Sequence, residues 1–148
     1  MHVKASDLTP GVLDGSALHA FKVGACGALA IAMHEELGWP IYAVTDAHNV
    51  EDGVAGGGSA LHWVVKRPDG LFVDVDGVHT EAELVSEYDG EADDGQCAVG
   101  KSTRADCWEW YGEAQGAPIP ISLAKKFVDA VVAKAAPKPQ SKPQRPRS

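Results

Sequence analysis

Residues 24–37 read GACGALAIAMHEEL, and this stretch decides the fold. Its apolar residues recur at the spacing of one helix face: Leu29, Ala30, Met33 and Leu37. Gly38, followed by Pro40, is a typical helix end. The pattern therefore predicts a helix over 26–37, with Cys26 at the point where a glycine-containing turn enters it.

A cysteine at the N-terminus of a helix is a candidate nucleophile. The unpaired backbone N–H groups and the helix dipole both stabilise the thiolate there, and the thiolate is the reactive form. Gly24 and Gly27 flank Cys26, and we expect them to let the backbone turn and a substrate approach. The neighbouring N–H groups are also expected to stabilise an oxyanion.

The segments after this helix predict strands and two further helices. Segments 41–44, 61–66 and 71–75 are predicted strands, the last two joined as an antiparallel hairpin by the turn Arg67-Pro68-Asp69-Gly70. Residues 46–59 are polar and glycine-rich and predict a flexible loop. A short helix is predicted after Thr80, capped by Thr80 with Glu83, and a C-terminal helix after a Ser122 cap. The sequence thus predicts an α+β fold.

A nucleophilic cysteine needs a base, and the base needs an acceptor that orients it. His62 lies at the start of the second predicted strand, Asp74 lies on the third, and Asp76 directly follows it. With a two-residue turn centred on Pro68-Asp69, positions that sum to about 137 or 138 face each other. The even sum places His62 and both aspartates on one face, and the odd sum takes both aspartates off it. The residues leave this register open.

Three segments in this order resemble the papain-like cysteine hydrolases, which include small NlpC/P60-type amidases and transglutaminase-like enzymes. They are Gly24-Ala25-Cys26-Gly27-Ala28-Leu29-Ala30, Leu61-His62-Trp63-Val64-Val65 and Asp69-Gly70-Leu71-Phe72-Val73-Asp74-Val75-Asp76-Gly77. The resemblance implies a papain-like fold, in which an N-terminal helix carrying the cysteine packs on an antiparallel sheet carrying the histidine and the acid. The family's pattern around the acid matches Asp74, which is preferred over Asp76. The chain differs from NlpC/P60 enzymes at Ala25 and Gly27.

The function expected from residues and resemblance together is a cysteine-dependent hydrolase or acyl transferase that acts on an amide, isopeptide or thioester bond. Cys26 is the expected nucleophile, His62 the base and Asp74 the residue that orients it. The expected substrates are peptide, protein or peptidoglycan-like amides, and no cofactor is required. Peptidase, amidase and deamidase activities stay open. The alternative is a non-catalytic protein-binding module on a papain-like scaffold.

The length of the chain limits the number of domains, and its charge distribution limits the kinds of partner. The 148 residues suit one domain over 1–136, followed by a disordered, basic, Pro-rich tail over 137–148. The last 14 residues carry four basic and no acidic side chains, which leaves nine basic against 21 acidic residues in the body. Such a body disfavours nucleic acid and anionic membranes, while the tail suits contact with an acidic partner.

Cysteine usage and the absence of apolar segments favour a cytoplasmic protein. The three cysteines are an odd number with no C-x-x-C pair, which fits a reducing compartment. No signal peptide and no apolar run of membrane-spanning length is evident.

One motif is set aside on its context. Residues 95–102 fit the phosphate-binding pattern G-x-x-x-x-G-K-S, but acidic residues rather than an apolar strand precede them, so nucleotide binding is not expected.

Overall fold

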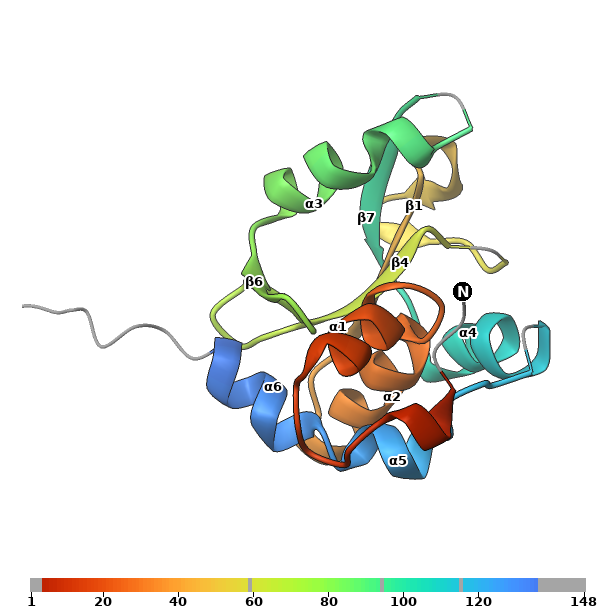
Figure 1. Ribbon diagram of the computed structural model, residues 1–148. Helices are drawn as coiled ribbons and strands as arrows, with labels where there is room; N and C mark the ends of the chain where they lie inside the picture. The colour runs from red at the N-terminus through yellow and green to blue at the C-terminus, as the bar shows by residue number, and fades with distance from the viewer. Residues whose placement is uncertain (1–3, 59, 94, 115, 136–148) are drawn as a thin grey trace, which may run out of the picture.

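The computed structural model describes residues 4–58, 60–93, 95–114 and 116–135, and within these ranges the chain has the predicted α+β fold (Figure 1). The tail predicted over 137–148 lies outside the described residues. The helices are α1 Gly15–Lys22, α2 Cys26–Leu37, α3 Glu81–Tyr88, α4 Arg104–Trp108, α5 Ile121–Lys125 and α6 Val128–Ala135, with a π-helical segment Glu109–Ala114 after α4 and 3-10 turns at Ala5–Asp7, Ala47–Asn49 and Asp89–Glu91. The strands are β1 Ile41–Asp46, β2 Val50–Glu51, β3 Val54–Ala55, β4 His62–Lys66, β5 Phe72–Asp74, β6 Gly77–His79 and β7 Cys97–Lys101.

The described strands form one sheet in the order β2-β3-β7-β1-β4-β5-β6. Strand β1 pairs antiparallel with both β4 and β7, and the β4, β5 and β6 strands follow as antiparallel neighbours. The sheet is mixed rather than antiparallel throughout, because β3 pairs parallel with β7.

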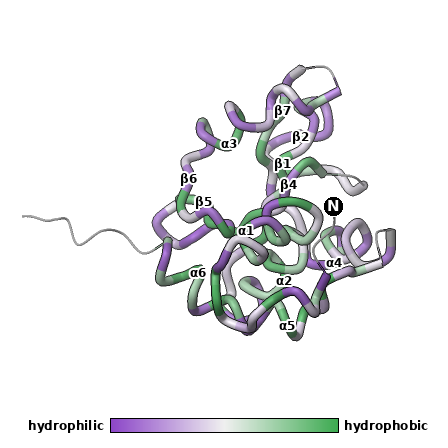
Figure 2. Tube along the Cα trace, viewed as in Figure 1, coloured by the Kyte–Doolittle hydropathy of each residue, from purple (hydrophilic) through white to green (hydrophobic). Residues whose placement is uncertain are grey.

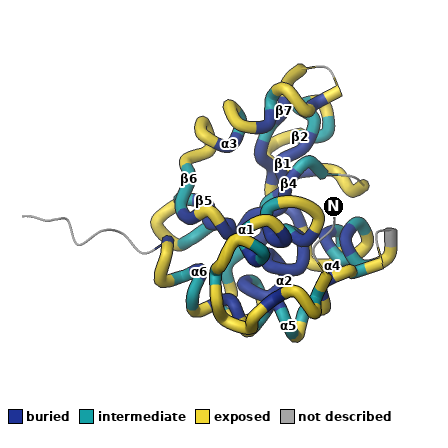
Figure 3. The backbone as a smooth tube through the Cα atoms, viewed as in Figure 1, coloured by how far each residue is buried: buried dark blue, intermediate teal, exposed yellow. Residues whose placement is uncertain are grey.

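Helices cover the two faces of the sheet unequally. Helix α2 packs on one face through Ala43, Trp63 and Val65, with α1, α5 and α6 around it. Helix α3 covers the other face, where Leu84 and Tyr88 pack with Val44, Val64, Phe72 and Val99. Figure 2 shows apolar residues along α2 and the central strands, and Figure 3 shows the same segments buried. Alternate residues of β4 therefore serve two different cores.

Several segments depart from the predicted elements. Helix α1 precedes the cysteine-bearing helix, which is therefore the second and not the first. Residues 46–59, predicted as a flexible loop, contain the hairpin of β2 and β3, whose turn uses a positive φ at Asp52 and Gly53. The single C-terminal helix is two short helices, and Pro120 rather than Ser122 occupies the N-cap of α5.

Two other local predictions are settled by the strand pairing. Val65 pairs with Val73 and Lys66 with Phe72, so paired positions in this hairpin sum to 138, the even register. The connection spans residues 67–71 and is not the two-residue turn predicted from Pro68-Asp69. The phosphate-binding pattern at 95–102 falls mostly on β7, an extended strand, so it does not form the loop and helix that such a site needs.

The described residues include no single helix that is long and apolar enough to cross a membrane. Helices α1 and α2 together meet that requirement by length and composition, but they are bent by 93° at their junction.

Gly27 has a packing role that differs from the one predicted. It is buried, and a Cβ atom placed there would lie 2.8 Å from the Tyr111 Cβ, so the glycine allows the π-helical segment to approach the first turn of α2. Gly24, with φ of 98°, is exposed and makes the turn into α2.

We expect the substitution Gly27→Ala to lower the free energy of unfolding by about 1–3 kcal/mol, because the added methyl group overpacks a filled site. Urea denaturation followed by circular dichroism measures this loss. The matched control is Gly15→Ala in α1, where a Cβ would meet no atom within 4 Å. Equal stability of the two variants would contradict the close packing at Gly27.

Candidate active site

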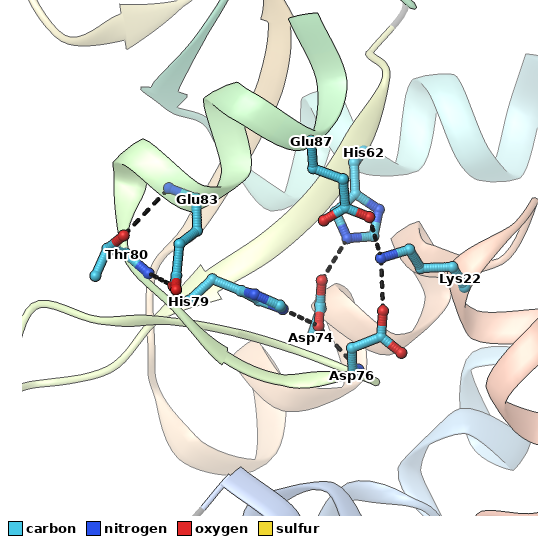
Figure 4. A network of polar contacts seen from close by, with 8 residues as sticks. All are labelled: Lys22, His62, Asp74, Asp76, His79, Thr80, Glu83 and Glu87. Atoms are coloured by element: carbon cyan, nitrogen blue, oxygen red, sulfur yellow. Dashed lines mark hydrogen bonds and ion pairs between the residues drawn. The ribbon is translucent and has the colours of Figure 1, made fainter.

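The structure brings His62 and Asp74 into direct contact at one end of the sheet. His62 Nε2 donates to Asp74 Oδ2 at 2.8 Å, and both side chains are almost fully buried, at 0% and 2% exposure (Figure 4). The even register places both side chains on the face covered by α3. Because a carboxylate that accepts from Nε2 fixes the ring, Nδ1 is the nitrogen left for another group.

Cys26 is the nucleophile candidate whose ionisation depends on His62. Burial disfavours its thiolate, but the charge of His62, a hydrogen-bonding contact with the His62 side chain and the backbone N–H of Trp63 together lower the pKa of the Cys26 thiol. His62 Nδ1 is buried and makes no hydrogen bond of standard geometry with the described residues, Cys26 included. Loose nucleophile–base contacts are common in catalytic sites without substrate.

The histidine and the acid are shifted in the directions that suit an ion pair. Burial lowers the pKa of His62, but the adjacent Cys26 sulfur and the hydrogen bond to Asp74 outweigh it and raise the pKa to about 10. Burial likewise opposes the charge of Asp74, yet hydrogen bonds from His62 and His79 hold its pKa well below the usual range. The three shifts all favour the ionised forms: the thiolate of Cys26, the imidazolium of His62 and the carboxylate of Asp74.

Tyr88 covers the imidazole of His62. The two rings stack with centroids 5.0 Å apart and planes inclined by 17°. Tyr88 is the last residue of α3 and is 5% exposed. The stacked ring excludes water from one face of the imidazole and limits its tilt.

Asp76, the other acid considered for this role, binds elsewhere. Its Oδ2 accepts from Lys22 Nζ at 2.6 Å, and the same ammonium group lies 2.6 Å from Glu87 Oε2 (Figure 4). Lys22 thereby connects the end of α1 to the β5–β6 turn and to α3. Asp76 contributes only its backbone N–H to the site, which donates to Asp74 Oδ1 at 2.9 Å.

Two cavities meet at Cys26. One, of about 220 Å³, has a polar wall that includes Lys22, Glu87 and Glu91. The other, of about 80 Å³, has an aromatic wall of Trp63, Trp110 and Tyr111, and the buried indole N–H of Trp63 has no hydrogen-bond partner among the described residues. Both are also lined by Gly24 and Leu61, so the two cavities are adjacent at the thiol.

The other two cysteines have different surroundings. Cys97 Sγ lies 3.4 Å from the Val85 carbonyl, and burial together with Asp89 raises its pKa to about 11. Cys107 Sγ lies 3.6 Å from the Gly27 carbonyl, and burial raises its pKa as well. Cys26 is therefore the cysteine whose thiol pKa is shifted downwards.

Two residues at this site were not predicted to belong to it, namely Tyr88 and His79. His79 Nε2 lies 2.8 Å from Asp74 Oδ1, so the carboxylate contacts two histidines (Figure 4). The sequence contains one signal for this contact, the dipeptide Asp76-Gly77, which favours a tight hairpin. Gly77, with φ of 121°, pairs with Asp74, and His79 then pairs with Phe72.

Comparison with known proteins provides no relative. The chain shows no significant match to a known protein family, a curated protein or a solved structure. No group of three or more His, Cys, Asp or Glu side chains in the described ranges is arranged to hold a metal ion.

Proposed function

We propose that this protein is a papain-like cysteine hydrolase or acyl transferase that acts on an amide, isopeptide or thioester bond. The observation that carries the proposal is the row Cys26–His62–Asp74, in which a buried 2.8 Å bond fixes His62 and the histidine lowers the pKa of the thiol. The helix terminus supplies the thiolate environment and the two strands supply the base and its acceptor, as in the papain-like arrangement that the sequence resembles.

In the first half-reaction the Cys26 thiolate attacks the carbonyl carbon of the substrate. The backbone N–H groups of Cys26 and Gly27, at the start of α2, are the proposed donors to the developing oxyanion, because an α-helix offers no acceptor to its first N–H groups. His62 Nδ1–H then protonates the leaving nitrogen or sulfur, and a thioester with Cys26 remains.

In the second half-reaction His62 takes a proton from water, or from an acceptor amine, that attacks the thioester. The acyl group leaves as an acid or as a new amide, and the thiolate–imidazolium pair is restored. Asp74 keeps the Nε2–H tautomer and holds the ring through both steps.

Selective alkylation tests the proposed nucleophile without knowledge of the substrate. At pH 6 we expect iodoacetamide to modify Cys26 at least tenfold faster than Cys97 or Cys107, because only Cys26 has a lowered thiol pKa. Peptide mass spectrometry locates the modified residue, and the urea-unfolded protein, in which all three cysteines should react alike, is the control. Equal labelling, or none at Cys26, favours the non-catalytic binding module.

A further inference from the structure

We propose that His79 is a fourth member of the site: a positioning residue that holds the Asp74 carboxylate so that Oδ2 faces His62. The catalytic effect of His79 rests on the proposed function. The geometry itself, a carboxylate held between two imidazoles, is independent of any activity.

The carboxylate of Asp74 is held on both oxygens. Oδ2 accepts from His62, while Oδ1 accepts from His79 Nε2 at 2.8 Å and from the Asp76 backbone N–H at 2.9 Å. Without His79, one backbone N–H alone would hold Oδ1, and rotation about the Cβ–Cγ bond of Asp74 would be less restrained. His79 and the Asp76 backbone N–H therefore act together to keep Oδ2 directed at His62.

The chain that follows His79 is anchored by hydrogen bonds and by a ring contact. His79 ends β6, and its side chain is 17% exposed. The next residue, Thr80, caps α3 and exchanges hydrogen bonds with Glu83 at 2.8 and 3.1 Å (Figure 4). Helix α3 ends with Tyr88 stacked on His62. One continuous segment, 77–88, thus contacts both Asp74 and His62.

The charged groups that face His79 come from three elements. The hydrogen bond with Asp74 of β5 raises the pKa of His79, burial opposes it, Glu87 of α3 raises it further, and Lys22 of α1 lowers it. The net shift favours the charged form of His79, so the effect of its charge and the effect of its hydrogen bond have to be tested separately.

Two uncharged replacements of His79 separate the effect of its hydrogen bond from the effect of its charge. Both His79→Gln and His79→Leu remove the titratable charge, but the glutamine amide retains an N–H donor at a similar distance from the backbone. The difference between the two variants therefore isolates the hydrogen bond. His34→Gln is the control, since His34 bonds to the Trp39 carbonyl at the other end of α2.

We expect two readouts to separate the variants. The His62 Nε2 proton, followed by NMR, should exchange with water about tenfold faster in His79→Leu than in His79→Gln, as expected for the loss of one hydrogen bond to a charged group. Alkylation of Cys26 at pH 6 should be slower in His79→Leu than in His79→Gln by a similar factor, with unchanged melting temperature in the control. If His79→Leu does not fold, His79→Met gives the same comparison.

The outcomes distinguish this proposal from the proposed function. Identical exchange and alkylation rates in the glutamine and leucine variants would overturn the positioning role, whatever the reactivity of Cys26. Faster proton exchange in His79→Leu, in a protein whose Cys26 shows no selective alkylation, would support the positioning role and reject the cysteine hydrolase.

Discussion

Replacement of His62 by alanine is expected to slow the alkylation of Cys26 at pH 6 by about 50-fold. The imidazole is the main group that lowers the pKa of this thiol, while burial acts in the opposite direction. A thiol with an ordinary pKa of about 8.5 is only ~0.3% ionised at pH 6, and burial reduces that fraction further. The higher intrinsic nucleophilicity of a more basic thiolate recovers a factor of about ten or more, so the net loss is smaller than the loss of thiolate.

The pH profile makes this expectation specific. The rate for His62→Ala should rise steadily to pH 9 and beyond, whereas the rate for the wild-type protein should level off at lower pH, so the two curves converge in alkali. Stopped-flow or quenched alkylation between pH 5 and 10, with His34→Ala as the control, measures both curves. Parallel profiles would show that His62 does not set the ionisation of Cys26.

Replacement of Asp74 by asparagine is expected to cost about 3 kcal/mol of unfolding free energy near pH 6. In the wild-type protein the two oxygens of Asp74 accept from N–H groups of His62, His79 and Asp76. An asparagine amide has one acceptor oxygen for these three donors. Removal of one partner from a buried ion pair typically costs about 3–5 kcal/mol of unfolding free energy. His62 can lose its proton in the variant, so we expect the lower end of this range.

This cost should depend on pH in a defined way. The folded-state pKa of Asp74 is lowered, so its contribution is complete above about pH 4 and is lost as the pH falls further. The folded-state pKa of His62 is raised to about 10, so its contribution is complete below about pH 6.5 and is lost as the pH rises towards 10. Both shifts describe the same His62–Asp74 pair. The difference in unfolding free energy between wild type and Asp74→Asn should therefore be largest between about pH 4 and pH 6.5.

Urea denaturation at a series of pH values measures this difference. The control is Asp76→Asn, which removes only a half-exposed ion pair with Lys22 and should cost no more than about 1 kcal/mol. A difference between wild type and Asp74→Asn that is constant from pH 4 to 10 would show that the pair does not carry this linkage.

The helix that begins at Cys26 could be predicted from the sequence because its signals are local. The same holds for the choice of Cys26 and His62 as candidate site residues. The 3.6-residue period of α2, the glycine turn before it and the Thr80–Glu83 capping box need no knowledge of distant contacts. The signal for the strand that starts near His62 is also local, and β4 does begin at this residue.

The choice between Asp74 and Asp76 depends on contacts that local patterns do not contain. The hairpin turn is longer than its Pro-Asp signal suggests, and the register follows from Val65 and Val73 facing the core below α2. Lys22, which binds Asp76, lies 54 residues away in the chain. The contact of His79 requires a second, tighter turn at Gly77, and that of Tyr88 requires the crossing of α3 over the sheet.

The packing of α2 against α5 and α6 has a consequence for synthesis of the protein. Cys26 leaves the ribosome early, His62 and Asp74 follow some tens of residues later, and the helices that complete the shell around α2 come last. Before His62 and Asp74 pack near Cys26, the group that lowers the pKa of its thiol is missing, and we expect the pKa of an ordinary cysteine. For the proposed enzyme, the lowered thiol pKa of Cys26 is therefore expected to appear only after the residues that surround it have been made and have packed together.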